Sequence, residues 1–178
     1  MTRANPLPHL WLISDARNDA GLERALARLP RRSGFIYRHY HLPDAVRLAR
    51  FRVLRRAARA RGHVVILADS ALTAREWGAD GIYGSPRALW PRRTGLLHLA
   101  TAHNLAEIGL AARLGADAVL LSPVFPTRTH PGGTVLGAVR FRLAARQSPL
   151  PVIALGGMTP HRARSLGWKR WAAIDGLS

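Results

Sequence analysis

The sequence predicts a compact parallel (β/α)8 barrel, the TIM-barrel fold, from three observations. Short apolar segments alternate with amphipathic segments along the chain, as expected for βα units. Eight such apolar segments can be identified, the number of strands in this barrel. A weak internal repeat appears at 77–82 and 114–119, where a helix end, a glycine, a short turn and a buried strand follow one another. A doubly wound sheet is the alternative interpretation.

The elements follow from apolar periodicity and from capping residues. Asn104 is expected to cap a helix, and Glu107 three residues later would complete a capping box. Thr159 is a second expected cap, because Pro160 follows it at the first helical position. The expected strands cover 9–15, 34–41, 63–69, 81–83, 97–103, 118–122, 152–155 and 172–175. The expected helices cover 22–29, 44–61, 72–77, 105–114, 139–147 and 160–166.

At 178 residues the chain is short for this fold, since about 250 residues are typical. Residues 84–94 include two prolines and leave little room for a fourth helix. The chain also stops directly after the eighth expected strand. We therefore expect a single domain over 1–178, with a short or missing fourth helix and no final helix.

The formal net charge of +17 raises the question of nucleic-acid binding. However, Lys169 is the only lysine, and all other basic side chains are arginine. This usage, with abundant Ala, Gly and Leu, indicates a coding bias, and many arginines recur on the face of the helix at 44–61, where we expect them to be solvated. We expect phosphorylated small molecules, and not nucleic acid, as partners. We expect no Schiff-base aldolase chemistry, because it needs a buried lysine on a strand and Lys169 is expected at the surface.

The chain contains no cysteine, which excludes disulfides, thiolate nucleophiles and cysteine-ligated zinc. This composition fits a reducing compartment, so we expect a cytoplasmic protein. No apolar stretch approaches the roughly 18–20 residues that a membrane span needs, so we expect no membrane partner.

Residues 115–137 are the most informative segment. A buried run at 118–121 leads into a loop that contains Thr127, Thr129, His130 and Gly132. Loops at the carboxyl ends of parallel strands are where α/β enzymes bind their ligands.

A second strand edge of this kind covers 151–158 and ends in Gly156 and Gly157. Loops after the seventh and eighth strands form the usual phosphate site of such barrels, because glycine lets backbone N–H groups approach an anion. Leu177 and Ser178, at the chain end, would complete that site. A phosphorylated small-molecule substrate is the simplest interpretation.

The chain resembles the thiamine phosphate synthase family, including its thiazole tautomerase relatives. The resemblance covers essentially the whole chain and is strongest over 101–158. Residues 115–130 match the family's Gly-Ala-Asp strand and Pro-Thr-x-Thr-Lys loop, 151–158 match its Gly-Gly edge, and 12–15 match its first strand. The resemblance implies a barrel enzyme that joins a pyrimidine diphosphate to a thiazole phosphate, with Mg²⁺ as cofactor and release of pyrophosphate.

By this resemblance, Thr127 and Thr129 would bind the thiazole substrate, and Gly156 and Gly157 its phosphate. His130 stands where the family has a lysine that meets the diphosphate, and the charge of an imidazole depends on pH.

Arg38 falls within the family's Gln-x-Arg-x-Lys pattern, so the resemblance assigns it to the pyrimidine diphosphate. Ile36 and Tyr40 occupy the other two positions of this pattern. Thr101 and His103 stand where the family has Ser-x-His. Thr101 can replace the serine hydroxyl, whereas His103 is interpreted as a histidine at a strand–helix junction.

Asp69 matches the aspartate of the family's Asn-Asp pair, which implies a Mg²⁺ ligand, but Ala68 replaces the asparagine. The family's second aspartate would fall near Arg87 and is missing. Mg²⁺ is usually bound through one or two carboxylates together with substrate phosphates. The alternative role of Asp69 is to cap the following helix.

The leading hypothesis is a thiamine phosphate synthase-like transferase. The alternative is a divergent homologue that binds a thiazole phosphate or a related phosphorylated ligand, in a tautomerase or regulatory role, without making thiamine phosphate. Pro123 occupies the position of the tautomerase histidine, which weakens the tautomerase interpretation. A third hypothesis, nucleic-acid binding through the arginine-rich helix, predicts strongly salt-dependent binding to any duplex.

Overall fold

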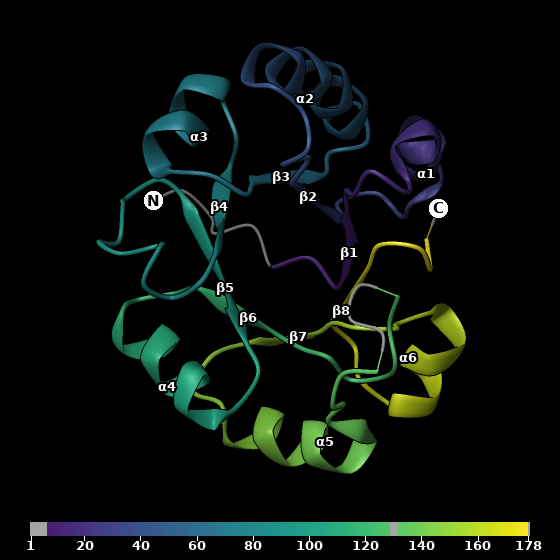
Figure 1. Cartoon of the computed structure of the whole chain (residues 1–178), viewed down its shortest axis with the longest axis vertical. Coiled ribbons are helices and arrows are strands. Elements are labelled where there is room, and N and C mark those ends of the chain that lie inside the picture. Colours follow the sequence, from purple (N-terminus) through teal and green to yellow (C-terminus); the bar gives the residue numbers. More distant parts are fainter. Residues whose placement is uncertain (1–6, 129–131, 178) are drawn as a thin grey trace.

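The computed structural model describes residues 7–128 and 132–177. Eight parallel strands follow one another in sequence order around a closed barrel, and the last pairs with the first (Figure 1). This confirms the predicted fold class. The strands are β1 (Leu10–Ile13), β2 (Gly34–Tyr37), β3 (Val64–Leu67), β4 (Gly81–Gly84), β5 (Leu97–Ala102), β6 (Ala118–Leu121), β7 (Val152–Ala154) and β8 (Trp171–Ala173).

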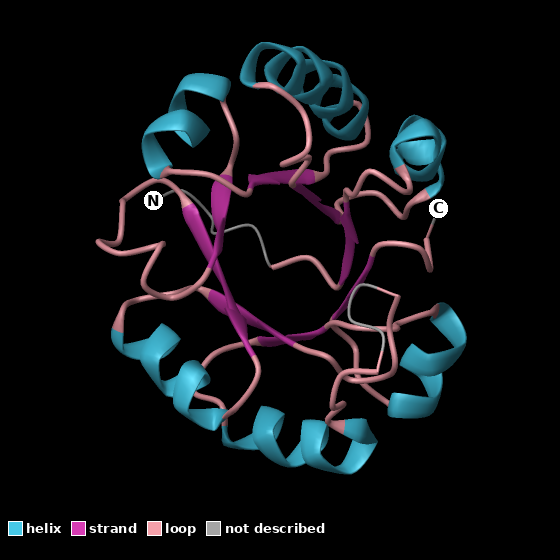
Figure 2. Ribbon diagram, in the orientation of Figure 1, coloured by secondary structure: helices cyan, strands magenta, loops and turns pink. Residues whose placement is uncertain are grey.

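The helices surround the barrel on the outside (Figure 2). No helix lies between β4 and β5, so the expected loss of the fourth helix is confirmed for this described segment. A short 3-10 helix, η1 (Asp19–Gly21), precedes the first α-helix and was not expected. The helices are α1 (Leu22–Arg28), α2 (Asp44–Arg59), α3 (Ala71–Trp77), α4 (Leu105–Arg113), α5 (Gly137–Gln147) and α6 (Pro160–Leu166).

Side chains alternate between two hydrophobic clusters along the strands, because successive residues of a strand point to opposite faces. In β1, Trp11 and Ile13 belong to a cluster with Ile36, Ile66 and other inward-facing residues. Leu12 instead belongs to a larger cluster shared with buried residues of the helices. The strands are therefore buried on both faces, as expected for a parallel barrel.

The strand predicted at 34–41 was too long, since β2 ends at Tyr37. His39 has a φ of 43°, in the left-handed region, which ends the extended backbone. The strand predicted at 9–15 likewise ends early, at Ile13. The side chains that follow these two strands therefore lie in loops at the carboxyl end of the barrel.

The expected helix caps are present. The Asn104 side chain accepts a hydrogen bond from the Glu107 N–H at 2.9 Å, and the Thr159 hydroxyl accepts one from the Arg162 N–H at 3.2 Å. The Glu107 carboxylate accepts from the His103 N–H at 2.8 Å and from the Asn104 side-chain amide at 3.0 Å, so the expected capping box is changed: its return bond reaches the N–H one residue before the cap. Gly78, in the repeat at 77–82, ends α3 with a φ of 73°, the left-handed C-cap inferred from that repeat.

None of the helices in the described ranges has the length and apolar character needed to cross a membrane.

Candidate functional site

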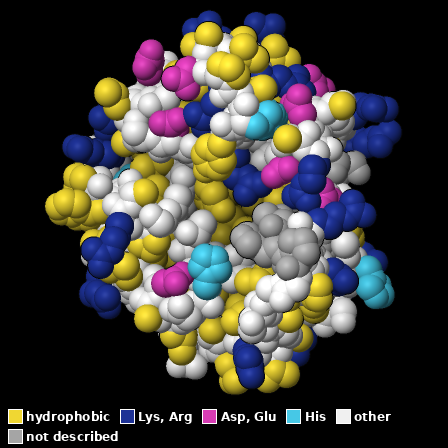
Figure 3. Space-filling view, in the orientation of Figure 1, with side chains coloured by type: hydrophobic (Ala, Val, Ile, Leu, Met, Phe, Trp, Pro, Cys, Tyr) yellow, Lys and Arg dark blue, Asp and Glu magenta, His cyan; other side chains and the backbone are white. Residues whose placement is uncertain are grey.

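A cavity of about 860 Å³ opens at the carboxyl ends of the strands. The space-filling view shows the hollow near the middle of this face, with Lys and Arg side chains spread around it and not gathered into one patch (Figure 3). Several predicted site residues line it together. They are Arg38, Thr101, Thr127, Gly156 and Gly157.

The loops after β6 and β7 are bonded to each other along one wall of the cavity. The Val124 N–H donates to the Leu155 carbonyl at 2.9 Å, and the Phe125 N–H donates to the Gly156 carbonyl at 3.1 Å. A Cβ at Gly156 would lie 2.7 Å from Cα of Pro123, so the two backbones approach too closely for a side chain. Gly156 also has a φ of 98°, which L side chains rarely adopt. The Gly-Gly pair therefore lets the two loops pack closely and presents backbone without side chains to the cavity.

Arg38 is held on the opposite side by contacts to the loop after β1. Its Nε donates to the Ser14 carbonyl at 3.1 Å, and its Nη2 donates to the Asp15 carboxylate at 2.8 Å. The Arg38 side chain is 17% exposed and lines the cavity. Tyr83 at the end of β4 also lines the cavity, and burial raises the pKa of its hydroxyl, which therefore stays neutral.

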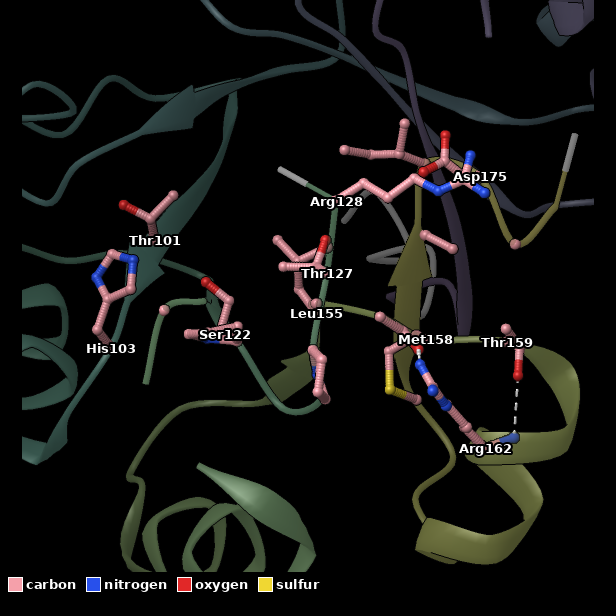
Figure 4. A pocket seen from close by; sticks show the side chains of 18 of the residues that line it. Thr101, His103, Ser122, Thr127, Arg128, Leu155, Met158, Thr159, Arg162 and Asp175 are labelled. Carbon is pink, nitrogen blue, oxygen red and sulfur yellow. Dashed lines mark hydrogen bonds between the residues drawn. The ribbon is translucent and has the colours of Figure 1, made fainter. Parts of the chain in front are cut away.

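Arg162 lines the cavity from the first turn of α6 (Figure 4). Its Nη1 donates to the Gly157 carbonyl at 2.6 Å, and its guanidinium lies 5.2 Å from the ring centroid of Phe125. Arg128 also lines the cavity, and its side chain extends toward Asp175 (Figure 4). The cavity thus has cationic side chains on several sides and an acidic one at its edge.

Thr101 and His103 mark the end of β5 on another side of the cavity (Figure 4). The Thr101 hydroxyl lies 3.5 Å from the Gly84 carbonyl, at the limit of a hydrogen bond. His103 Nδ1 lies 2.9 Å from the Glu107 carboxylate. The interpretation of His103 as a junction residue agrees with these contacts, and its ring also reaches the cavity.

Asp69 follows β3 but is not among the residues that line the cavity. It forms an ion pair with Arg47 of α2 and accepts a hydrogen bond from the Ser70 N–H at 2.7 Å. Burial alone would raise the pKa of the Asp69 carboxyl, but these hydrogen bonds outweigh it and lower the pKa. The alternative role of Asp69 as helix cap is wrong, because the Ser70 hydroxyl accepts from the Thr73 N–H and caps α3.

These donors do not fit the Mg²⁺ ion that the resemblance implies. The single carboxylate at this position already faces a guanidinium, and Ala68 offers no side-chain oxygen. No cluster of three or more His, Asp and Glu side chains in 7–128 and 132–177 could hold a metal ion.

The remaining predicted residues lie at or beyond the cavity edge. Gly132 is exposed with a φ of 74° and does not line the cavity, although its neighbour Gly133 does. Leu177 packs against the larger hydrophobic cluster, which the strands share with the helices, and Gly176 beside it lines the cavity. Thr129, His130 and Ser178 lie outside the described residues, so their assigned roles stay predictions.

Lys169 is exposed, as predicted, and precedes β8 at the amino end of that strand. The cavity is at the carboxyl ends, so the only lysine of the chain lies at the opposite end of the barrel. It is not placed to form a Schiff base there.

Sequence reasoning missed several cavity residues. Tyr83, Ser122 and Asp175 lie at or just after strand ends, so the rule that found Arg38 and Thr101 could have found them. Arg162 had no such signal, because it reaches the cavity from a helix.

The sequence matches the family model described as "Thiamine monophosphate synthase" over residues 10–176. A thiamine-phosphate synthase of Xanthomonas campestris is 30% identical over 167 residues, which is 88% of this chain and 80% of that protein. The thiamine-phosphate synthase of a Synechococcus species is 30% identical over 183 residues, 94% of this chain and 52% of that protein. The chain therefore spans about half the length of some curated relatives.

Among solved structures, the thiamine phosphate pyrophosphorylase from Pyrococcus furiosus is similar, with a TM-score of 0.77 and 24% identity over 93% of this chain and 84% of that one. A structure titled "Native KDPGal structure" has a TM-score of 0.67 and 14% identity, over 100% of this chain and 87% of that chain. At these identities the structures share the barrel fold.

Proposed function

The chain belongs to the thiamine monophosphate synthase family, and we propose that it is a thiamine phosphate synthase-like transferase. In the proposed reaction the thiazole nitrogen attacks the methylene carbon of a hydroxymethylpyrimidine diphosphate. The carbon–oxygen bond to the diphosphate breaks, and pyrophosphate leaves with the electron pair. The observation that carries the proposal is the meeting of Arg38, Thr127, Gly156 and Gly157 around one cavity.

We assign the thiazole phosphate to the wall formed by the loops after β6, β7 and β8. Gly156, Gly157 and Gly176 line this wall, where side-chain-free backbone lets an anion approach N–H groups. The guanidinium of Arg162 adds a positive charge there. Thr127 lines the same wall and would contact the thiazole. Phosphate loops after strands seven and eight are common in such barrels.

We assign the pyrimidine diphosphate to the opposite side, beside Arg38. A guanidinium fixed by Ser14 and Asp15 needs little reorganisation as negative charge develops on the departing pyrophosphate. The predicted role of His130 would add to this. The protein would act mainly by orienting the two substrates and stabilising charge.

No step of this proposal passes through a metal ion. Thiamine phosphate synthases generally depend on Mg²⁺, but the Asp69 carboxylate here is paired with Arg47. Positive charge from arginine side chains takes its place in the proposal.

The second candidate is a homologue that binds the thiazole phosphate, or a related phosphorylated ligand, without making thiamine phosphate. The Arg47–Asp69 pair favours it, together with Ile36 and Tyr40 at positions of the family's diphosphate pattern. These departures concentrate at the diphosphate side, whereas the phosphate wall retains its glycines.

Calorimetry with each substrate, with and without Mg²⁺, followed by a pyrophosphate-release assay, separates the two candidates. Binding of both substrates with release of pyrophosphate supports the synthase, and Arg38→Ala should then reduce release more than thiazole phosphate affinity. Binding of thiazole phosphate alone, without release, supports the second candidate. Absence of binding by either substrate contradicts both.

We also propose phosphorylated small molecules, and not nucleic acid, as partners, and a cytoplasmic location. The basic side chains around the cavity face are spread out (Figure 3), and the cysteine-free composition fits a reducing compartment. Lack of a mobility shift of duplex DNA or RNA at low salt would support the first proposal, whereas steeply salt-dependent duplex binding would contradict it.

A further inference from the structure

A chain of three hydrogen bonds runs behind Arg38, away from the cavity. The Arg38 N–H donates to Ser14 Oγ at 2.8 Å. Ser14 Oγ and His39 Nδ1 lie 2.8 Å apart, and His39 Nε2 lies 2.8 Å from Oδ1 of Asp19. The chain thus connects the loop after β1, the end of β2 and η1.

The directions of these bonds follow from donor chemistry. A backbone N–H can only donate, so Ser14 Oγ accepts from Arg38, and an ionised carboxylate can only accept, so His39 Nε2 donates to Asp19. Because neutral His39 then carries its proton on Nε2, its Nδ1 accepts, and Ser14 donates its hydroxyl proton to Nδ1. Burial lowers the pKa of His39 despite the Asp19 carboxylate, which favours the neutral ring.

The array contains serine, histidine and aspartate, but it is not a nucleophilic triad. Ser14 is fully buried and His39 is 1% exposed, so no substrate reaches the hydroxyl. The Ser14 oxygen is moreover already used by Arg38. The array therefore serves the fold around Arg38 and does not attack a substrate.

His39 is constrained by neighbouring rings and by the residues that fix Asp19. Its ring stacks on Tyr37, with centroids 4.7 Å apart and planes 15° from parallel, and the His41 ring centroid lies 5.1 Å away. Arg50 of α2 fixes Asp19 through an Nε to Oδ1 hydrogen bond of 2.7 Å and also pairs with Glu23. The left-handed backbone of His39 is thus held in place by its side chain.

We propose that His39 is a positioning residue for the anion-binding guanidinium of Arg38. Through Ser14 it fixes the Arg38 backbone at the point where β2 ends, and its turn at a φ of 43° directs the chain away from the strand. Ser14 also accepts the Arg38 Nε–H through its carbonyl, so one residue holds both backbone and side chain. This inference rests on the proposed function only in that Arg38 binds an anion.

The test compares His39→Ala with His63→Ala. His63 is an equally suitable buried histidine, 3% exposed, whose ring accepts from the Ser33 N–H at 3.1 Å and contacts the Leu26 carbonyl at 3.0 Å. It precedes β3, at the amino end of the barrel, far from the cavity. The probe is inorganic pyrophosphate, and calorimetry measures its binding. Binding to the Arg38→Ala variant gives the background that does not depend on the Arg38 guanidinium. Thermal unfolding shows whether each variant is folded.

We expect His39→Ala to weaken pyrophosphate binding about tenfold, as for loss of one hydrogen bond that organises a charged group. His63→Ala should lower Tm by about as much as His39→Ala does, but it should change the affinity for pyrophosphate little. His39→Asn, whose side-chain oxygen can still accept from Ser14, should recover part of the affinity. Equal affinities for the two alanine variants, or no pyrophosphate binding above the Arg38→Ala background, would overturn the proposal.

A second measurement does not depend on a ligand or on folding of a variant. Nitrogen-15 chemical shifts of the His39 ring in the unaltered protein should show the neutral form with its proton on Nε2. A proton on Nδ1 of the neutral ring would contradict the hydrogen-bond directions and overturn the proposal. Failure of pyrophosphate release with intact pyrophosphate binding would count against the synthase function and leave this inference standing.

Discussion

Arg47 and Asp69 form an ion pair between the first turn of α2 and the residues after β3. The Arg47 side chain is 7% exposed, donates to the carbonyls of Arg38 and Ala68, and lies within 6 Å of three aromatic ring centroids. A guanidinium held in this way is part of the core between α2 and the barrel, so the expectation that the arginines of this helix are solvated is wrong for Arg47. It balances the negative charge of the Asp69 carboxylate within the folded protein.

Loss of Arg47 should therefore cost much more stability than loss of an exposed arginine. We expect Arg47→Ala to lower the free energy of unfolding by about 3 kcal/mol, because Asp69 loses its partner in a partly buried position. Arg59→Ala is the matched control. Its pair with Asp80 has side chains that are 46% and 38% exposed, so we expect a loss of about 0.5 kcal/mol. Urea unfolding checks both values, and equal losses would contradict the prediction.

The same pair predicts how the free protein responds to Mg²⁺. A divalent cation would have to displace Arg47 from Asp69, so millimolar Mg²⁺ should leave Tm unchanged, apart from a general salt effect. Thermal unfolding with Mg²⁺ and with an equal ionic strength of NaCl measures this. A saturable rise in Tm with Mg²⁺ alone, abolished by Asp69→Asn, would show that the carboxylate binds the metal after all.

Stability should fall as the pH falls below about 6.5. Burial lowers the pKa of His39, His63 and His98 in the folded protein. The unfolded chain takes up protons near the ordinary histidine pKa while the folded chain does not, so the unfolded state gains stability as the pH decreases. Above that pH these three histidines are neutral in both the folded and the unfolded state, so they no longer make stability depend on pH.

Thermal unfolding from about pH 8 to about pH 5 covers this window without overlap from the carboxylates. The pKa values of Asp15, Asp19 and Asp69 are lowered, so their stabilisation is lost only below about pH 4. His63→Gln should make the decrease in Tm between pH 6.5 and pH 5 less steep, because the unfolded chain then takes up roughly one proton fewer. A Tm that stays constant down to about pH 5 would contradict the prediction.

Gly34 faces the indole of Trp11 inside the barrel, where a Cβ at Gly34 would lie 2.0 Å from Cε3 of Trp11. Gly34→Ala should destabilise the protein by about 3 kcal/mol, at the upper end for overpacking. Gly21→Ala, where nothing lies within 4 Å of the added Cβ, should change stability by less than about 0.5 kcal/mol. A Trp11→Leu change should restore part of the loss in Gly34→Ala, which a double-mutant cycle would detect.

The Gly34–Trp11 contact illustrates which parts of the fold the sequence could predict. Strand number and helix caps depend on neighbours within a few residues, as at Asn104 and Glu107, and were correct. The Gly34–Trp11 contact joins adjacent strands whose register no local pattern reveals. The end of β2 was missed for a related reason, since the left-handed backbone of His39 depends on Ser14 and Asp19 from another segment.

The same distinction applies to the candidate site. Arg38, Thr101 and Gly156 follow strands directly, so the barrel topology alone places them at one end, and they line the cavity. The resemblance suggested a metal role for Asp69, but its environment depends on Arg47, a residue 22 positions earlier whose partner could not be inferred. Arg162 reaches the cavity only because the first turn of α6 follows the loop after β7 closely.

Arg162 provides a direct test of the phosphate wall. Arg164 lies in the same helix, carries the same charge and is exposed away from the cavity, so it controls for helix stability and for net charge. We expect Arg162→Ala to weaken binding of thiazole phosphate about tenfold, as for loss of one charge-assisted hydrogen bond. Arg164→Ala should leave it unchanged, and Arg162→Lys should retain part of the affinity through charge alone. Calorimetry at two salt concentrations should show a weaker salt dependence for Arg162→Ala only. Equal affinities of the two alanine variants would place the phosphate elsewhere in the cavity.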